Sequence, residues 1–441
     1  MTSRGGHRLH PQGGASQAHH PDPAPQLSFS RIVQGQMHSN LFWCFVAFGV
    51  QGTSQWALVL LLARYGTPEM LGLFTLAFAI STPLQVMIAQ LQSLLSTDAA
   101  FKFSTQSYFV LGSSLSILVA VTVPSAMIVV GAGLPIVEAV FLIASAKAVE
   151  NVGGLIYAVL QRQDRWKLIA SSMIVRGGAS VLSFGALLVA TKHLLPALAG
   201  MVVAWLLCLF ILDIGWLLRR YSVPDPYSRR LSWKEIRTLV HEAWPLSITA
   251  VLISLYSHFP RYYVQMMLGL RSLGYYGALS YTLTAGDLAG AIFGRASTSQ
   301  IAAAKVRGVS VRPALMRLCH IALATVGPAA VLGILFSRRL LGWLYGIGYD
   351  THVEAFRWLI IGAIITGLAQ FLSYALTANR ILKGQMFLSV ANIVISIIAL
   401  SILVPRLGML GVALSINLVA AFRVVVSFFL WSQAIAKSSS L

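Results

Sequence analysis

The sequence predicts an all-α polytopic membrane protein, with about twelve transmembrane helices in two six-helix lobes around a central cavity. Apolar residues make up 57% of the chain and charged residues only 10%, and the mean hydropathy of +0.76 lies outside the range of soluble domains. Twelve apolar segments are each long enough for a bilayer core, which takes about 20 helical residues. Because hydrocarbon offers backbone groups no hydrogen-bond partner, we expect these segments to be helical.

The twelve expected spans fall into two sets of six. The first set covers residues 40–62, 71–95, 108–130, 135–161, 168–191 and 194–218. The second set covers residues 243–268, 273–304, 314–340, 351–376, 384–403 and 408–431. We therefore expect residues 39–218 to form an N-lobe and residues 243–432 to form a C-lobe.

A polar stretch at residues 219–242 separates the two sets of spans. It contains two Pro residues and charges of both signs, which is typical of a linker. We expect this linker to lie in the cytoplasm. Its part 231–240 is expected to form a short amphipathic helix, with Trp233 as an anchor at the membrane interface.

Residues 1–38 are rich in Gly, Pro, His and Gln and lack an apolar stretch, so we expect a disordered cytoplasmic tail and no cleavable signal peptide. Residues 433–441 form the expected cytoplasmic C-terminal tail. The histidines of the first tail are irregularly spaced and lack Cys or carboxylate neighbours, and all three cysteines lie in or beside apolar spans. We therefore expect no metal site, no cofactor and no disulfide.

The net charge of +19 would suggest a nucleic-acid partner in a soluble protein. Here the basic residues are distributed by side: outside the spans or near their ends, twenty lie on the side of the N-terminus and six on the opposite side. The positive-inside rule then predicts that both termini lie in the cytoplasm. The excess charge indicates contact with anionic membrane lipids, and no nucleic acid is needed to explain it.

Six of the expected spans contain a Lys or Arg at least six residues from either end. Four of these basic residues lie deep in their spans: Lys147, Arg176, Arg295 and Arg423. A basic residue at the centre of a lipid-facing helix costs about 2.5 to 3.5 kcal/mol, so we expect these four to face a water-filled cavity. Arg261 follows Pro260, where a kink could turn it into that cavity or toward the outer headgroups. Arg357 is expected near the outer interface.

Two acidic residues lie deep in the same spans. Glu150 follows Lys147 by one helical turn, so the two can pair, either as a structural ion pair or as part of a polar site. Asp287 falls near the centre of the eighth expected span. Because a nearby cation changes the proton affinity of a desolvated carboxylate, either acid is a candidate for exchanging H⁺ or Na⁺. The polar residues of the first two spans either contact a cargo or bond across helices: Gln51, Thr53, Gln55, Gln90 and Gln92.

Several stretches of the chain resemble a known family. They are LARYGTPEMLGLFTLAFAISTPLQ at 62–85, PRYYVQMMLGLRSLGYYGALSY at 260–281, LYGIGYDTH at 344–352, and LTANRILKGQ and VPRLGMLGVALS near the end. From about residue 30 onward the chain resembles the Wzx-type oligosaccharidyl-lipid flippases of the multidrug/oligosaccharidyl-lipid/polysaccharide (MOP) exporter superfamily. The matching stretches are helix and loop patterns without a catalytic signature.

The resemblance implies a transporter and not an enzyme. Such a protein moves an oligosaccharide linked to undecaprenyl pyrophosphate from the cytoplasmic to the outer leaflet, for the export of O-antigen, capsule or exopolysaccharide. The expected ligands of the anionic head group are the cavity cations Lys147, Arg176, Arg261, Arg295 and Arg423. We expect alternating access by rocking of the two lobes, hinged at the linker and at kinks near Pro83, Pro245 and Pro260.

Three alternatives stay open. A polytopic polysaccharide polymerase or ligase would use a similar lipid-linked substrate, but such enzymes usually have a sizeable external loop, and the expected external connections are short. A drug exporter of the same superfamily would suit an acidic lumen, whereas bases predominate in these spans. A lipid II flippase usually has two further helices, for which this chain has no room.

Overall fold

The computed structural model describes residues 24–98, 102–218, 232–306, 312–346, 348–378 and 382–439, which are almost entirely helical and contain no strand. The helices of the first half are α1 (Ala24–Tyr65), α2 (Pro68–Thr97), α3 (Thr105–Val129), α4 (Leu134–Arg162), α5 (Trp166–Thr191), α6 (Leu194–Cys208) and the π-helix η1 (Leu209–Leu218). Those of the second half are α8 (Trp233–Leu279), α9 (Tyr281–Val306), α10 (Arg312–Leu335), α11 (Ser337–Tyr345), the 3-10 helix η2 (Tyr349–His352), α12 (Val353–Ala378), α13 (Leu382–Leu407) and α14 (Met409–Ser439).

Among the described residues, ten helical segments are long and apolar enough to cross a membrane, and α10 with α11 forms a bent eleventh. One of the ten, Trp233–Gly294, is 62 residues long and runs through α8 into α9, so it covers two expected spans. Each expected span therefore has a helix in the structure, namely α1–α6, α8–α10 and α12–α14. The prediction of an all-helical, multi-pass membrane protein is confirmed.

Two glycines mark places where the chain reverses between long helices. Gly269 interrupts α8 with a φ of 81° and a ψ of 176°, a conformation open to glycine because it has no Cβ. This break lies between the seventh and eighth expected spans. Gly408, with a φ of 56°, separates α13 from α14. Both boundaries are close to the positions expected from hydropathy.

The ninth expected span, 314–340, is too long at its end. Helix α10 stops at Leu335, and α11 follows after a bend of 85°. Arg338 and Arg339 of α11 are exposed. Because two arginines are costly in hydrocarbon, a continued straight helix would be unfavourable, and the chain instead turns at the end of the bundle.

Two further expectations change near the first tail and the linker. Residues 24–38, expected to be part of a disordered tail, are helical and belong to α1, whereas residues 1–23 lie outside the described residues. The amphipathic helix expected at 231–240 is not a separate element, because the helix that begins at Trp233 continues into α8. The linker residues 219–231 also lie outside the described residues.

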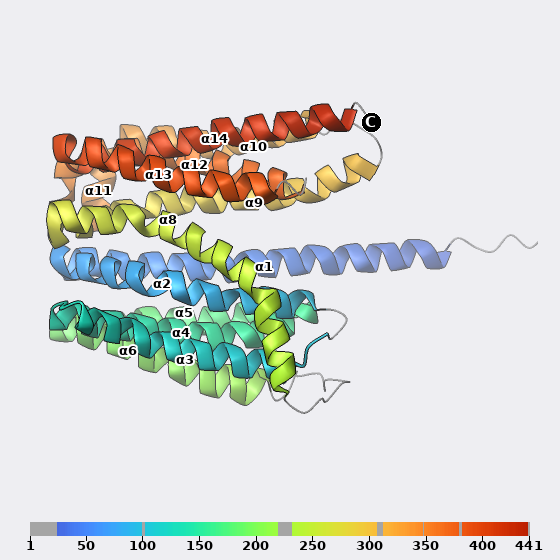
Figure 1. Ribbon diagram of the computed structural model, residues 1–441, viewed down its shortest axis with the longest axis horizontal. Helices are drawn as coiled ribbons and strands as arrows, with labels where there is room; N and C mark the ends of the chain where they lie inside the picture. Colours follow the sequence, from blue (N-terminus) through green and yellow to red (C-terminus); the bar gives the residue numbers. More distant parts are fainter. Residues whose placement is uncertain are drawn as a thin grey trace, which may run out of the picture.

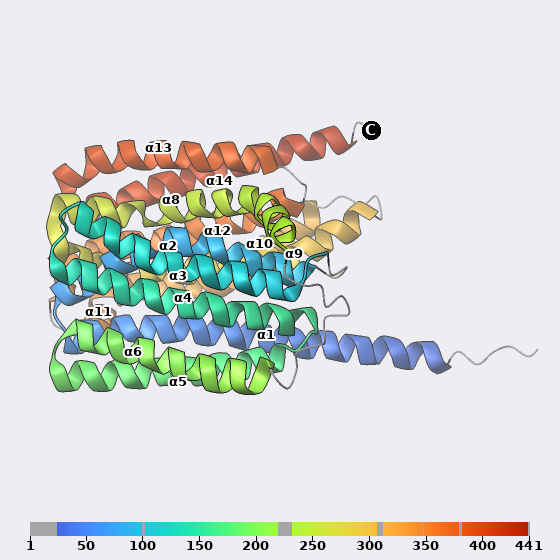
Figure 2. The same ribbon diagram turned by 60° about the horizontal axis from the view of Figure 1, so that its bottom comes forward.

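Figure 1 shows that the helices form two groups, and Figure 2 shows the same arrangement after rotation. Helices α1–α6 pack on one another, and in the second group α12 packs on α9 and α14. Helix α8 lies between the groups and packs mainly along α2. Helix α1 begins and α14 ends at the same end of the bundle. We call this the inner end and the opposite one the outer end, after the orientation expected from the charges.

The first turns of α8 run across the inner end before the helix turns along α2 (Figure 1). Two acids hold this segment against the connection between α2 and α3: Glu242 pairs with Lys102, and Glu235 accepts a hydrogen bond from the Ser104 N–H. The Trp233 side chain is 84% exposed. The start of α8 therefore remains attached to the first group, while its tryptophan is free to contact lipid headgroups.

At the outer end the backbones of α2 and α8 are in direct contact. A Cβ atom on Gly72 of α2 would lie 2.0 Å from the carbonyl oxygen of Leu270, and one on Gly274 of α8 would lie 1.9 Å from that of Pro68. The Arg64 side chain at the end of α1 donates hydrogen bonds to backbone carbonyls of α11. Only glycine permits such a close approach, so this end is sealed by main-chain packing.

Candidate binding site between the two helix groups

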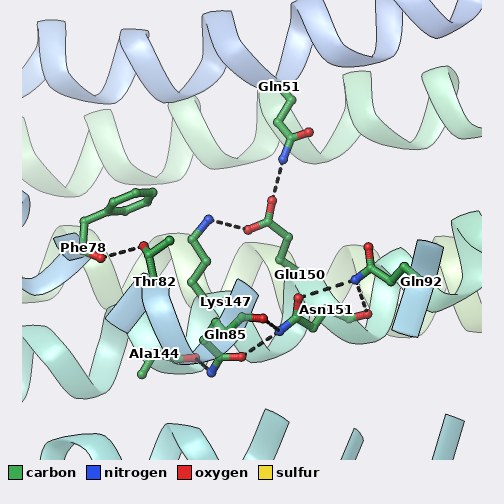
Figure 3. A network of polar contacts seen from close by, with 9 residues as sticks. All are labelled: Gln51, Phe78, Thr82, Gln85, Gln92, Ala144, Lys147, Glu150 and Asn151. Atoms are coloured by element: carbon green, nitrogen blue, oxygen red, sulfur yellow. Dashed lines mark hydrogen bonds and ion pairs between the residues drawn. The ribbon is translucent and has the colours of Figure 1, made fainter. Parts of the chain in front are cut away.

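Lys147 and Glu150 of α4 form an ion pair inside the first group (Figure 3). Lys147 Nζ lies 2.8 Å from Glu150 Oε2, and each side chain is only 16% exposed. Gln51 of α1 donates a second hydrogen bond to Glu150 Oε1 at 2.6 Å. The ammonium group also lies 4.7 Å from the centre of the Phe78 ring on α2. Three helices therefore contribute to the surroundings of this pair.

Amide side chains hold α2 and α4 together beside the ion pair (Figure 3). Asn151 Nδ2 donates to Gln85 Oε1 at 2.7 Å, and Gln85 Nε2 donates to the Ala144 carbonyl at 3.3 Å. Gln92 Nε2 donates to the Asn151 carbonyl at 3.1 Å. Gln85 and Gln92 thus bond across helices and satisfy buried polar groups. Gln55, by contrast, lines a hollow described below.

Arg176 of α5 is buried between two aromatic rings, with 6% of its surface exposed. The guanidinium carbon lies 5.4 Å from the centre of the Tyr157 ring and 5.3 Å from that of Trp205. Asp213 of η1 is 1% exposed and accepts hydrogen bonds from the Ser172 and Tyr157 hydroxyls. Arg176 and Asp213 interact electrostatically without a direct bond.

Asp213 is absent from the predicted site residues, because the sixth expected span contains no Lys or Arg that would indicate a polar site there. The signal was present as a lone carboxylate in the apolar stretch LFILDIGWLL. With Asp213 included, Lys147 and Arg176 face two carboxylates, those of Glu150 and Asp213. The described charges inside the first group are therefore balanced, and its interior is less cationic than we expected.

Arg261 of α8 is half-buried. Its Nη1 contacts Nδ1 of His258 one turn earlier, and its charge acts on Tyr281 of α9. The ring of His258, which is 7% exposed, lies 6.1 Å from the Phe78 ring that Lys147 covers. Lys147 and Arg261 therefore approach the same space from α4 and α8.

Arg423 and Asp287 make up the polar part of the second group. Arg423 Nη2 of α14 donates to Gln370 Oε1 at 3.0 Å and to Ser373 Oγ at 2.9 Å, both on α12. Asp287 of α9 interacts with Arg423 and with Thr366, and its side chain is exposed in this structure. These two charges lie on the opposite group of helices from the Lys147 pair.

The remaining predicted residues lie elsewhere. The side chain of Arg295 is outside the described part of the chain. Arg357 pairs with Glu354 at 2.7 Å at the start of α12, in agreement with its expected place near the outer interface. Cβ atoms on Gly286 and Gly290 would lie 2.1 Å from carbonyl oxygens of α12, so these glycines serve helix packing.

Two adjoining hollows lie beside the side chains of Lys147, Glu150 and Arg176. The first is lined by residues from α1, α4, α5 and α6: Gln51, Ser54, Gln55, Leu58, Glu150, Met173, Arg176, Gly177, Ser180 and Trp205. The second shares Gln55 and Trp205 with the first and reaches Lys147 of α4 and Tyr281 of α9. Within the described residues, the Ser180 hydroxyl and the Trp205 indole N–H are buried there without a hydrogen-bond partner.

This arrangement is suited to binding anions and hydroxyl-bearing ligands. Lys147 of α4 and Arg176 of α5, together with amide, hydroxyl and indole groups, can form charge-assisted and neutral hydrogen bonds with such a ligand. The described residues contain no cluster of three or more His, Cys, Asp or Glu side chains that could hold a metal ion.

No family model matches the chain. The chain is 24% identical over 408 residues to the capsular polysaccharide biosynthesis protein CapF of Staphylococcus aureus. The alignment covers 90% of this chain and 100% of CapF. It aligns with an inward-facing multidrug resistance transporter of the MATE family, a member of the MOP superfamily, with a TM-score of 0.75, 14% identity and coverage of 90% of this chain and 99% of that one.

Two further solved structures are similar to the chain. The lipid II flippase MurJ in an inward closed conformation aligns with a TM-score of 0.66 and 14% identity, covering 88% of this chain and 87% of MurJ. An outward-facing MATE transporter aligns with a TM-score of 0.59 and 15% identity, covering 90% of this chain and 95% of that one. The chain thus has the fold of the MOP exporter superfamily, as its resemblance to the flippases of that superfamily predicted.

Proposed function

We propose that this protein moves a polyprenyl-pyrophosphate-linked oligosaccharide from the cytoplasmic to the outer leaflet of a bacterial inner membrane, for surface polysaccharide export. Both termini lie in the cytoplasm, and the two lobes, 39–218 and 243–432, move against each other about the linker. The fold and the likeness to a capsular polysaccharide biosynthesis protein support this proposal. On this view the protein acts as a carrier and not as an enzyme.

One observation carries the proposal: Lys147 and Arg176 line two adjoining hollows, and the charge of Arg261 acts on Tyr281, which also lines the second hollow. Such charges are expensive in a bilayer unless they face water, an acid or an anionic ligand. A pyrophosphate supplies the anion, while the unpartnered Ser180 and Trp205 groups suit the hydroxyls of a glycan. Arg423, and Arg295 from the same half of the chain, would bind the head group from the second lobe.

The packing of the helices supports alternating access. The outer end is sealed by the contacts of Gly72 and Gly274. Among the described residues, α9, α10 and α12–α14 make no extensive contact with α1–α6, so the two groups are joined mainly through α8. The higher TM-score with an inward-facing relative than with an outward-facing one agrees with an arrangement closed outside and open inside.

Coupling to H⁺ or Na⁺ through Glu150 or Asp287 is part of the proposal. The two acids differ in their surroundings, since Glu150 is bonded by Lys147 and Gln51 whereas Asp287 is exposed beside Arg423. Exchange of H⁺ or Na⁺ at Asp287 would break fewer hydrogen bonds and ion pairs than exchange at Glu150. Transport that is indifferent to proton and sodium gradients in vesicles would remove this coupling.

The test is transport in proteoliposomes of a fluorescent polyprenyl-pyrophosphate disaccharide, with quenching of the dye in the outer leaflet as the readout. We expect Lys147→Ala, Arg176→Ala and Arg261→Ala each to slow transport by about tenfold or more, because each removes a charge-assisted bond to the head group. Arg271→Ala is the matched control, since Arg271 is 69% exposed at the outer end. Transport at the wild-type rate in all three site variants would refute the site.

A second candidate is a drug exporter, and one observation favours it: three acids, Glu150, Asp213 and Asp287, lie in the spans. Acids suit organic cations, and the multidrug transporters share this fold. The same vesicles distinguish the two, because a drug exporter would transport an organic cation such as ethidium and would not transport the lipid-linked disaccharide.

A further inference from the structure

His258 occupies an unusual position in the space that Lys147 and Arg261 share. It is 7% exposed, and its ring is edge-on to Phe78 of α2 at 6.1 Å between centres. The charged groups that act on it are Arg261 of its own helix and Lys147 of α4. The charge of Arg261 also acts on Tyr281 of α9. A buried imidazole thus lies between two bases and has no acid among the groups acting on it.

The contact between Arg261 and His258 determines the protonation of the imidazole. A guanidinium has only donors, so the Nη1 to Nδ1 contact exists only if Nδ1 carries no proton. His258 is therefore neutral in this arrangement, with its proton on Nε2. Within the described part of the chain, the imidazole is the hydrogen-bond partner of Arg261, and it takes the place that an anion would occupy.

The charges of the neighbouring groups suggest which anion fits. Glu150 already compensates Lys147 at 2.8 Å, so Lys147 adds little net charge. A diphosphate esterified at both ends carries a negative charge on each phosphate. Arg261 supplies a single positive charge, and a protonated His258 would supply the second. The pair then matches a diphosphate diester, whereas Arg261 alone matches a monoanion such as a phosphatidylglycerol headgroup.

We propose that His258 is the proton-linked partner of Arg261: the neutral imidazole accepts the Arg261 hydrogen bond while the site is empty, and takes up a proton from solvent when a diphosphate diester binds the guanidinium. This inference rests on the proposed function and extends it, because cargo binding and proton uptake become one event. The proton leaves again when the cargo leaves and Arg261 returns to Nδ1.

The test is calorimetric titration of the full chain in detergent with P1-geranyl P2-methyl diphosphate, in two buffers of different ionisation enthalpy. This diester does not titrate near neutral pH, so any proton taken up belongs to the protein. We expect wild type to take up roughly one proton per bound diester at pH 7 to 8, with affinity rising as pH falls. In His258→Asn the amide oxygen can still accept from Arg261 but cannot be protonated, so uptake should vanish while binding persists.

Controls separate this inference from the proposed function. His193→Gln changes an exposed histidine and should keep wild-type uptake. Equal uptake by wild type and His258→Asn would overturn the role of His258 and leave the anion site intact. Absence of diester binding by wild type, or unaltered binding by Arg261→Ala, would overturn the anion site and this inference with it.

Two further arms complete the design. Equal binding and uptake with geranyl methyl phosphate, or abolition of binding by phosphatidylglycerol, would assign the site to a monoanionic lipid headgroup and overturn the diphosphate. If His258→Asn does not fold, selective ¹⁵N-histidine labelling of wild type serves instead. We then expect a single imidazole to become an imidazolium on addition of the diester, and no change in any histidine would overturn the inference.

Discussion

The ion pair of Lys147 with Glu150 is best examined by comparing Lys147→Met, Glu150→Gln and the double variant. The pair is 2.8 Å long and each side chain is 16% exposed, so removing either partner leaves a charge in a poorly solvated place. Breaking a buried pair in this way costs about 3 to 5 kcal/mol. We expect about 3 kcal/mol for Lys147→Met, because Gln51 still donates to Glu150.

In the double variant no charge remains unpaired, so its stability should return to within about 1 kcal/mol of wild type. Unfolding can be followed with a thiol-reactive dye in a background in which Cys44 and Cys319 are replaced by Ser, since Cys44 is only half-buried whereas Cys208 is 7% exposed and becomes accessible on unfolding. Transport should behave differently: both variants that lack Lys147 should remain slow, because the double change restores charge balance and not the cation. Recovery of transport together with stability in the double variant would refute a role in cargo binding and leave the pair purely structural.

Three further predictions concern packing and charge. Gly274→Ala should lower stability by about 1 to 3 kcal/mol, because its Cβ would lie 1.9 Å from a carbonyl oxygen of α2. Gly178→Ala, with no atom within 4 Å, should be neutral or stabilising by up to about 1 kcal/mol. Asp213→Asn should cost about 3 kcal/mol, since it removes a carboxylate near the buried Arg176. Arg423→Gln should slow transport with a stability loss of only about 1 to 2 kcal/mol, because its bonded partners are uncharged.

The dye assay and the vesicle assay check these three. Equal unfolding temperatures for Gly274→Ala and Gly178→Ala would contradict the close contact at the outer end. Wild-type stability of Asp213→Asn would mean that Arg176 is compensated by other groups. Wild-type transport by Arg423→Gln would exclude Arg423 from the cargo path.

Much of the fold could be predicted because hydropathy and backbone chemistry agree. The break at Gly269 fell between two expected spans, since an apolar run was interrupted by a residue that tolerates positive φ. The end of the ninth span was wrong because hydropathy does not detect a change of direction, although Arg338 and Arg339 gave a signal that the span ends before them. The start of α1 was also missed, because the polar composition of residues 24–38 argues against a membrane span and says less about helicity.

The candidate site was less predictable than the fold. Spacing alone indicated the pairing of Lys147 with Glu150, which lie one turn apart on one helix. The roles of Asp213 and His258 depend on contacts between helices that are far apart in sequence. A single sequence does not show which residues of such helices face each other. A lone histidine in an apolar helix most often belongs to the core, and only its contact with Arg261 distinguishes His258 from that case.

The balance of charges also bears on how an empty carrier can change conformation. Moving an unpaired charge through a low-dielectric space costs several kcal/mol, so a site with many free cations would hold the empty protein in one state. In this structure Glu150 and Asp213 offset Lys147 and Arg176. Arg261 is hydrogen-bonded to a neutral imidazole. Cargo that brings its own negative charges and a proton to His258 would leave the loaded site nearly neutral as well. Both the empty and the loaded protein could then cross between states at comparable electrostatic cost, which a carrier that cycles requires.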